Sequence, residues 1–477
     1  MVEAQRKRID FTKWFRDVTL MAEVYDYRVL VKGCGVWPGY GFKLRNNVLS
    51  ILRRLLDETG HEECLFPLLI PRNLLAKEAE HIRSFEKEVF WVTKGGDVEL
   101  DEKLALRPTS ETVIMPMFKL WIHSHTDLPK KVYQVVSVFR YETKATHPMI
   151  RVREVTTFKE AHTAHASPED AERQVKEAVG IYRKFFDELG IPYVVSMRPP
   201  WDKFAGAIYT ISFDTLMPEG RALQIGTVHN LGQNFSKAFE VEYLKPDGSR
   251  DYVYTTSYGV SERVVAALIS IHGDDHGLVL PPKVAPIQAV VVPIPYKGRE
   301  TEVAEAARKV RELVAEAGIR VRLDDRDDVT PGEKFYYWEL KGVPVRVEVG
   351  PRDVESGTAT LCRRDSLERS KVGVNEVAER IKDLFVDIER SLRERAWREF
   401  KEGLIYASTL DEARELVAAR RGIVHVAWCG SEECGLRLED EVEGRVLGTP
   451  LDEEEVEGRC VVCRGEAATM VRLAKTY

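Results

Sequence analysis

The 477-residue sequence contains no apolar run close to the roughly 18 residues that a membrane-spanning helix needs. Residues 1–17, MVEAQRKRIDFTKWFRD, are charged throughout and lack the apolar core of a signal peptide. Low-complexity tracts and short internal repeats are also missing. Because apolar residues make up 44% of the chain and charged residues 31%, we expect a soluble globular protein of two or three domains, located in the cytoplasm.

An excess of positive charge is missing too, since 70 lysines and arginines stand against 77 aspartates and glutamates, a formal charge of −7. That balance gives no overall support for nucleic-acid binding. Any RNA partner must therefore be met by a local basic face of the protein.

Cysteine is scarce except near the C-terminal end. Three cysteines are scattered, at Cys34, Cys64 and Cys362. The other four follow the pattern C-x4-C, 25 intervening residues and C-x2-C, at Cys429, Cys434, Cys460 and Cys463. In a cytosolic chain this spacing predicts a four-thiolate zinc site, with disulfides or four free thiols as the alternatives. The site would be structural, because four thiolates leave no open coordination position.

The organisation of the chain changes at residues 281–288, PPKVAPIQ, where three prolines in eight residues indicate a linker. Before it, helical and strand patterns mix irregularly, which predicts an α+β domain with a mostly antiparallel sheet flanked by helices. After it, strands and helices alternate, which predicts an α/β domain with a partly parallel sheet. A long charged helix then leads to the cysteines, in a small zinc-binding α+β domain. The predicted domains cover residues 1–283, 284–385 and 386–477.

The segment VFRYETKATHPMIRVREVTTFKEAH, residues 138–162, places cations and an aromatic ring on two neighbouring strands. A guanidinium group suits phosphate oxygens and stays charged when desolvated. Arg140 could hold a phosphate while an adenine ring stacks on Phe158. A salt-bridged hairpin built on Arg140 and Glu142 explains this segment alone equally well.

Two further segments change that balance. In YGVSERVVAALISIHGD, Gly259 and Arg263 stand at the entry to an apolar helix, whose positive N-terminus favours a second phosphate contact. GFKLRNNVLSILRRLLDE is followed by ECLFPLLIP, a helix and then a strand with Pro67. Together the three segments resemble motifs 1, 2 and 3 of the class II aminoacyl-tRNA synthetases, in the same order.

Other stretches resemble the prolyl-tRNA synthetases of that class, in their archaeal/eukaryotic-like form. They are LALRPTSETVIMPMFKLWI (104–122), KFAGA (203–207), HNLGQNFSKAF (229–239) and WELKGVPVRVEVGPRDVE (338–355). The four cysteines and the terminal Tyr477 fit that form. One departure is REVTTFKEAH, where many relatives have a shorter REFLWQEGH. It makes the adenine partner a choice between Phe158 and Val155, of which we take Phe158.

The resemblance implies roles for matching residues. Thr109 and Glu111 would hold the proline amine, and Arg140 its carboxylate and the α-phosphate. The proline ring would be walled by Trp201, Phe204 and His229. ATP would be bound by Arg140, Glu142, Arg151, the backbone of Val152, Phe158, Gln224, Thr227, Ser261 and Arg263. Arg140, Arg263 and Glu111 would carry the catalysis. Judged alone, Glu111 could be a helix N-terminal acid, His229 a core histidine, and His162 either a supporting or a surface residue.

The resemblance also implies the activity: ligation of proline to tRNA(Pro) through a prolyl-adenylate, with ATP, Mg²⁺ and structural Zn²⁺. The first domain would be catalytic, and the second would bind the anticodon, with Arg346, Glu348 and Arg352 as candidates or as an ordinary solvated strand face. We expect a homodimer through motif 1 and no membrane association. About a hundred residues between Glu160 and Gly259 leave too little chain for an editing insert. The alternatives are a sibling synthetase for another small amino acid such as threonine, and a non-catalytic tRNA-binding paralogue.

Overall fold

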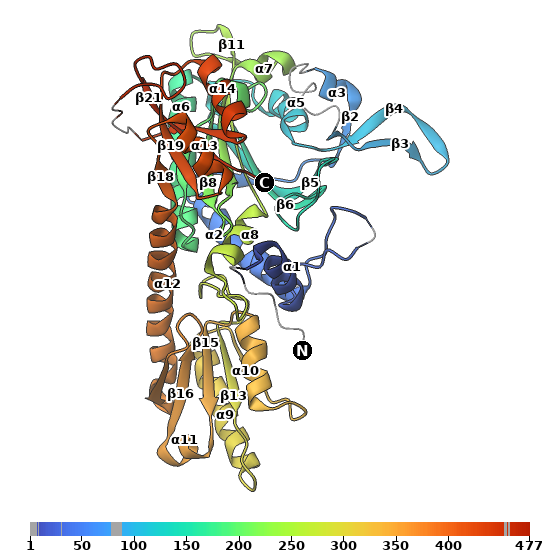
Figure 1. Ribbon diagram of the computed structural model, residues 1–477. Coiled ribbons are helices and arrows are strands. Elements are labelled where there is room, and N and C mark those ends of the chain that lie inside the picture. The colour runs from blue at the N-terminus through green and yellow to red at the C-terminus, as the bar shows by residue number, and fades with distance from the viewer. Residues whose placement is uncertain (1–6, 8, 30, 78–87, 453–455, 457) are drawn as a thin grey trace.

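The computed structural model describes residues 7, 9–29, 31–77, 88–452, 456 and 458–477 (Figure 1). Its largest element is an eleven-stranded sheet with the strand order β1-β5-β6-β12-β9-β8-β7-β20-β21-β19-β18. From β5 to β7 every neighbouring pair is antiparallel, which confirms the predicted sheet. The strands are β1 (Glu62–Glu63), β5 (Lys130–Phe139), β6 (Glu154–His165), β7 (Val194–Met197), β8 (Tyr209–Leu216), β9 (Ala222–Gly232), β12 (Tyr254–Ser261), β18 (Leu404–Tyr406), β19 (Ile423–Trp428), β20 (Arg445–Pro450) and β21 (Thr469–Ala474).

Amphipathic helices pack against this sheet, as their sequence periodicity predicts. In α6 (Pro168–Leu189) the Ser167 hydroxyl accepts from the Asp170 N–H at 3.1 Å, and the helix ends at Gly190 with φ 65°. Its aromatic face joins one apolar core with the buried face of α2. The helices of this region are α1 (Phe11–Met21), α2 (Gly39–Asp57), α3 (Arg72–Ala76), α5 (Glu111–Trp121), α6, α7 (Asn234–Phe239) and α8 (Arg263–His272), with single 3-10 turns η2 (His125–Asp127) and η3 (Pro200–Asp202).

The strand predicted over residues 63–71 is mostly wrong. Side chains take up the backbone groups of its middle part: the Phe66 N–H donates to Gln134 Oε1 at 3.0 Å, and Arg107 Nη1 donates to the Phe66 carbonyl at 2.7 Å. Pro67 has no N–H to offer a strand ladder. Only the two ends of this segment pair with other strands, one in β1 and the other in β2 (Leu69–Pro71). The strand β2 belongs to a separate three-stranded sheet with β4 (Val98–Leu106) and β3 (Trp91–Gly95). Elsewhere, β10 (Glu242–Leu244) and β11 (Arg250–Tyr252) form a hairpin.

A second sheet has the order β14-β13-β15-β16-β17, parallel among the first three strands and antiparallel after β15, which confirms the partly parallel prediction. In β15 the three valines join an apolar core with α9 and α12, and Arg346 and Glu348 alternate with them. We call this region the five-stranded domain. Its elements are β13 (Ala289–Pro293), β14 (Val321–Leu323), β15 (Val345–Val349), β16 (Thr358–Arg363), β17 (Arg369–Gly373), α9 (Glu300–Glu316), α10 (Pro331–Leu340), α11 (Pro351–Ser356) and the turn η4 (Val374–Glu376).

The long charged helix is α12 (Val377–Glu402), which runs from the five-stranded domain to the C-terminal segment, residues 404–477 (Figure 1). That segment adds α13 (Leu410–Ala418), α14 (Glu432–Val442) and four strands to the fold. Its β20 pairs with β7, so these strands continue the large sheet. The predicted boundary at 385/386 falls inside continuous α12, and the domain limits stay predictions.

The linker at residues 281–288 is packed into the molecule. Val284 and Ala285 are fully buried in the same core as α2 and α6. Arg320 Nη2 donates to the Pro282 and Ala285 carbonyls at 3.0 and 2.9 Å. Among the helices of the described residues, none is long and apolar enough to cross a membrane.

Candidate active site

A cavity of about 500 Å³ opens on the large sheet, between β6, β9, β12 and the start of α8. It gathers segments that lie far apart in the sequence, because β12 pairs with both β6 and β9. Thirteen predicted site residues line it: Thr109, Glu111, Arg140, Glu142, Arg151, Val152, Phe158, Phe204, Gln224, Thr227, His229, Ser261 and Arg263.

Three arginines, Arg140, Arg151 and Arg263, line one part of the cavity. Arg263, the first residue of α8, donates from Nε to the Ile150 carbonyl at 2.9 Å and forms no ion pair within the described part of the chain. Burial, together with the charges of Arg140 and Arg151, lowers the pKa of Arg263 to about 10, against a smaller opposite effect of Asp214 and Glu142. Like charges that are buried together are costly unless an anion joins them. This part of the cavity is therefore suited to an anionic ligand.

The aromatic surface beside these arginines is Phe158 on β6. The Arg140 guanidinium lies over its ring, 5.8 Å from the centroid. On β12, a Cβ at Gly259 would approach the Phe158 ring to 3.2 Å, so a glycine at this position leaves the ring room. Val155 lines the same cavity. The choice of Phe158 over Val155 as adenine partner stays a prediction.

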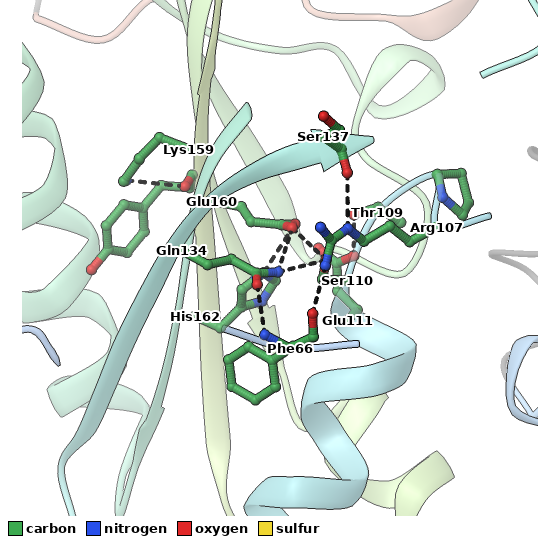
Figure 2. Close-up of polar contacts among 12 residues, drawn as sticks. Phe66, Arg107, Thr109, Ser110, Glu111, Gln134, Ser137, Lys159, Glu160 and His162 are labelled. Carbon is green, nitrogen blue, oxygen red and sulfur yellow. Dashed lines mark hydrogen bonds and ion pairs between the residues drawn. The ribbon is translucent and has the colours of Figure 1, made fainter. Parts of the chain in front are cut away.

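A buried polar network lies around Glu111 (Figure 2). Glu111 is the first residue of α5, is 3% exposed, and accepts a hydrogen bond from the Thr109 hydroxyl. Ser110 does not cap the helix with its side chain; its hydroxyl donates to Glu160 instead. Gln134 Nε2 also donates to Glu160, at 2.9 Å. The alternative interpretation, that Glu111 is an acidic residue at a helix N-terminus, gives its position correctly. Its carboxylate also faces the cavity.

Glu160 is held in its charged form. Burial disfavours the carboxylate, but hydrogen bonds from His162, Ser110 and Gln134 outweigh burial and keep the pKa of Glu160 below its usual value. His162 is 1% exposed and its Nε2 lies 3.5 Å from Glu160 Oε2. The surface alternative for His162 is thus wrong, because its buried side chain lines the cavity beside Glu160.

His229 and Phe204 form an aromatic wall near Glu111. Their ring centroids are 4.7 Å apart, and His229 Nδ1 lies 2.9 Å from the Thr210 hydroxyl. Burial, with a smaller effect of His162, lowers the pKa of His229 to about 3. The imidazole is therefore neutral near pH 7 and does not repel a cationic ligand.

Trp201, the third predicted wall residue, is not among the described residues that line the cavity. Its ring packs in the core of the C-terminal segment, in a T-shaped contact with Trp428 at 6.3 Å. The physical reason is that β20 extends the sheet beside β7 and brings that core against the turn η3.

Several cavity residues escaped the sequence analysis. Arg198 and Asp214 form a buried ion pair at 3.0 Å, and Arg445, Thr476 and Tyr477 reach the cavity from the C-terminal segment. An arginine before two prolines gives no pattern that signals such a pair. The last two residues are placed by tertiary pairing, since the Ala222 N–H donates to the Lys475 carbonyl at 2.8 Å.

The four predicted metal ligands come together at the C-terminal segment. One sulfur from each of Cys429, Cys434, Cys460 and Cys463 lies within 4.8 Å of the others. The Cys429 and Cys463 sulfurs are 3.8 Å apart, which matches the edge of about 3.8 Å expected for a tetrahedron with 2.3 Å zinc–sulfur bonds. The donor set and its spacing therefore fit a structural zinc ion.

The anticodon candidates separate into two kinds. Arg346 and Glu348 are each 6% exposed and bonded to each other at 3.0 Å, so the alternative of a solvated strand face is wrong. Arg346 also donates to Glu339 at 2.7 Å. Arg352 is exposed on α11. Their role in anticodon reading stays a prediction.

Comparison with known proteins identifies the family. Residues 90–272 match the class II tRNA synthetase core domain (G, H, P, S and T), residues 288–384 an anticodon binding domain, and residues 410–477 the prolyl-tRNA synthetase C-terminal domain. The chain is 58% identical to the proline–tRNA ligase of Methanopyrus kandleri over 98% of this chain and 96% of the relative. It is 59% identical to that of Aeropyrum pernix over 98% of each.

Solved structures agree. The Giardia lamblia prolyl-tRNA synthetase in complex with prolyl-adenylate superposes with a TM-score of 0.96, at 36% identity and over 100% of both chains. The Cryptosporidium parvum enzyme, complexed with halofuginone and AMPPNP, gives 0.94 at 32% identity, over 100% of this chain and 97% of that one. The chain therefore belongs to the class II prolyl-tRNA synthetases, the ATP-dependent proline–tRNA ligases.

Proposed function

We propose that the cavity activates proline with ATP to prolyl-adenylate and then transfers the prolyl group to the 3′ end of tRNA(Pro). The observation that carries this proposal is the meeting of Arg140 and Arg263 in one cavity with the buried carboxylate of Glu111. Two guanidinium groups suit a phosphate, and a carboxylate suits the secondary ammonium of proline. The relatives whose structures hold prolyl-adenylate and AMPPNP support ATP as a substrate.

At the amino-acid end, Glu111 accepts from the proline ammonium, and the Thr109 hydroxyl fixes the Glu111 carboxylate. His229, neutral near pH 7, and Phe204 wall the ring without adding charge. The proline carboxylate then attacks the α-phosphorus in line, with Arg140 on the phosphate oxygens. Positioning and charge stabilisation supply most of the acceleration, because no covalent intermediate with the protein is needed.

At the nucleotide end, Phe158 stacks on adenine, while Glu142, Arg151, the backbone of Val152 and Ser261 hold the nucleotide. Gln224 and Thr227 line the space between the nucleotide and the amino acid. Mg²⁺ held here by carboxylate oxygens would supply charge neutralisation for the leaving pyrophosphate. The Glu142 carboxylate, 3.6 Å from Arg151 Nε, is the kind of oxygen ligand that Mg²⁺ prefers.

Neither alternative function has support. A threonine enzyme is expected to hold a catalytic-domain zinc through cysteine and histidine, yet the metal-type cluster found among the described residues is the four-cysteine one. The relatives named above are proline–tRNA ligases. A non-catalytic paralogue is disfavoured because Arg140 and Arg263 are both present and both line the cavity.

We also propose a homodimer. Large apolar side chains of the motif 1 region are exposed: Leu65 by 82%, Leu69 by 41% and the neighbouring Trp121 by 38%. A contiguous exposed apolar patch is typical of a protein interface. Sedimentation at micromolar concentration should give twice the mass of one chain, 54.4 kDa; a mass of one chain contradicts the dimer.

The cysteine cluster is proposed to hold zinc, and the cytoplasm is proposed as the location. The seven cysteines are all free, which fits a reducing compartment. Zinc content near one ion per chain supports the first proposal, and the absence of bound metal in protein purified without chelator contradicts it.

The chain is further proposed to lack a cis-editing domain, because the described residues between Glu160 and Gly259 form β6 to β12 with α6 and α7. A pocket that fits proline separates it from alanine by only one or two groups, worth about 1–3 kcal/mol each. Efficient hydrolysis of mischarged alanyl-tRNA(Pro) by this chain contradicts the proposal.

The decisive experiment is amino-acid-dependent pyrophosphate exchange, screened across all twenty amino acids. Proline should support the fastest exchange by a wide margin. Exchange driven by threonine, or by no amino acid, contradicts the proposed function. Transfer is then measured as radiolabelled proline on tRNA(Pro).

A further inference from the structure

Trp201 is held by the C-terminal segment, directly before the cavity-lining part of its own loop. The loop joins β7 to β8, and its residues Asp202, Lys203 and Phe204 line the cavity while Trp201 packs away from it. A single short turn therefore has one end in the C-terminal core and the other in the substrate cavity.

Both contacts of the indole are next to cysteines of the metal cluster. Trp428, which meets Trp201 at 6.3 Å and 84°, precedes Cys429. Gly435, on α14, follows Cys434; a Cβ there would lie 2.1 Å from Trp201 Cη2. The Trp428 indole N–H in turn donates to the Ser431 carbonyl at 3.1 Å, so this surface is fixed within the cluster.

The other end of the loop builds the wall of the proline pocket. The Phe204 N–H donates to the Thr210 hydroxyl at 2.9 Å, and the same hydroxyl lies 2.9 Å from His229 Nδ1. The Phe204 ring packs against His229, with the centroids 4.7 Å apart and the ring planes tilted by 33°. The loop is held further by the Asn234 side chain, which donates to the Gly206 carbonyl at 2.8 Å.

From this arrangement we propose that Trp201 is a positioning residue for proline recognition, and that the C-terminal segment, which carries the cysteine cluster, acts on the active site through Trp201. The inference rests on the proposed function. The indole docks in the slot between Trp428 and Gly435 and fixes the loop, which keeps Phe204 against His229. Among the described residues, no hydrogen bond or ion pair joins Phe158 or Arg263 directly to residues 201–206, so the nucleotide end of the cavity is expected to be insensitive.

The central test compares steady-state constants in proline-dependent pyrophosphate exchange. Trp201→Ala should raise KM for proline about tenfold and leave KM for ATP within twofold of the unmodified protein. Trp201→Phe keeps an aromatic ring in the slot and should restore most of the proline affinity. Unchanged KM for proline in Trp201→Ala, or an equal rise for ATP, overturns the inference.

Gly435→Ala gives a second test that leaves the loop sequence intact. Alanine is favoured over glycine in a helix, but here its Cβ would displace the indole. We expect KM for proline to rise in Gly435→Ala and no additional rise when the change is made in Trp201→Ala. A rise that persists in the Trp201→Ala background shows that it does not act through the indole and overturns the inference.

The matched control is Gly180→Ala in α6, where a Cβ meets nothing within 4 Å. It should leave both KM values unchanged. Thermal unfolding of each variant, measured alongside, separates a specific shift in proline affinity from loss of folded protein, which would lower kcat for both substrates together.

Cys463→Ser tests the metal arm, because this exposed thiol does not contact Trp201. Bound zinc should fall and KM for proline should rise, with no additional rise in Trp201→Ala. Loss of zinc with an unchanged KM for proline overturns the link between cluster and loop. If the unmodified protein shows no proline-dependent exchange, the proposed function itself is contradicted. If all variants are active and share the same KM for proline, only the inference about Trp201 is contradicted.

Discussion

Two arginines of this protein have opposite electrostatic surroundings: Arg263 is half-buried at the start of α8, and Arg346 is buried within β15. Arg263 faces the cavity, and burial with the neighbouring arginines lowers its pKa to about 10. Arg346, in the five-stranded domain, is also buried, but its bonds to Glu339 and Glu348 overcome burial and raise its pKa. The first arginine has Asp214 and Glu142 only as nearby charges and is left room for an anionic ligand, whereas the second is bonded to two carboxylates of its own chain.

This difference separates a binding group from a structural one. A buried charge needs a partner, and removing one member of a satisfied pair leaves the other uncompensated. Arg346 completes a network inside the fold, so the case for it as an anticodon reader is weaker than the case for exposed Arg352. Arg263 is incomplete without a ligand, which agrees with a role in binding ATP.

The largest expected effect is on stability, in Arg346→Met. Glu348 and Glu339 would lose their buried cation, which should lower the free energy of unfolding by about 4 kcal/mol. Denaturant unfolding measures this loss. Arg352→Met is the matched control, because an exposed arginine should change stability by less than about 0.5 kcal/mol. Equal stability of the two variants contradicts the assignment of Arg346 as a structural cation.

For Arg263→Met we expect a loss of activity and no loss of stability. Loss of a cation aimed at the phosphates should lower kcat/KM in proline-dependent pyrophosphate exchange by about 100-fold or more, or about 3 kcal/mol. Stability should not fall, since the change removes a buried charge repelled by Arg140 and Arg151. Arg346→Met, assayed where it is folded, should keep its exchange rate. Full activity in Arg263→Met contradicts the assignment of Arg263 as a ligand-binding cation.

The sequence was sufficient to predict that Arg140 and Arg263 meet at one cavity, because they occur at a strand end and a helix start within recognisable motifs. Arg346 and Glu348 alternate with the valines of β15, a spacing that places both on one face of the strand. That spacing could not show that Phe335 and Glu339 of α10 cover that face, because helix placement over a sheet is a tertiary property. The solvated-face alternative was wrong for this reason.

Trp201 shows the same limit more sharply. The sequence places it two residues before KFAGA, a stretch that does line the cavity in part, so proximity along the chain favoured a wall role. Its partners, Trp428 and Gly435, come from a segment far along the chain that joins the sheet through β20. No local pattern encodes that pairing of β20 with β7.

A buried carboxylate beside Arg263, that of Glu262, should make the stability of the protein depend on pH. Glu262, next to Arg263, accepts from the Thr156 hydroxyl at 2.6 Å and the Thr157 N–H at 3.0 Å, yet burial raises its pKa from 4.5 to about 7. Because the folded-state pKa is the higher one, ionisation of Glu262 reduces stability as the pH rises from about 4.5 to about 7. The full reduction is about 3 kcal/mol above that range.

Glu262→Gln removes this titration and keeps an acceptor oxygen for Thr156 and Thr157. Compared with the unmodified protein, the variant should gain up to about 3 kcal/mol of unfolding free energy between pH 5 and pH 8. Unfolding measured at both pH values checks the sign. A difference between the two proteins that does not change with pH shows that Glu262 stays ionised in the fold.

The smallest expected effect concerns the aromatic rings beneath Arg140 and Arg346. Arg140 lies 5.8 Å from the Phe158 centroid at the cavity, and Arg346 lies 3.9 Å from the Phe335 centroid in the five-stranded domain. Only the first ring is available to a base. Phe158→Ala should therefore raise KM for ATP about tenfold, since stacking of a base on an aromatic side chain is worth about 1–3 kcal/mol. Phe335→Ala should leave KM for ATP unchanged and lower stability instead. Val155→Ala decides the adenine partner: if it raises KM for ATP more than Phe158→Ala does, the base stacks on Val155, and the ring at Phe158 serves only to hold Arg140.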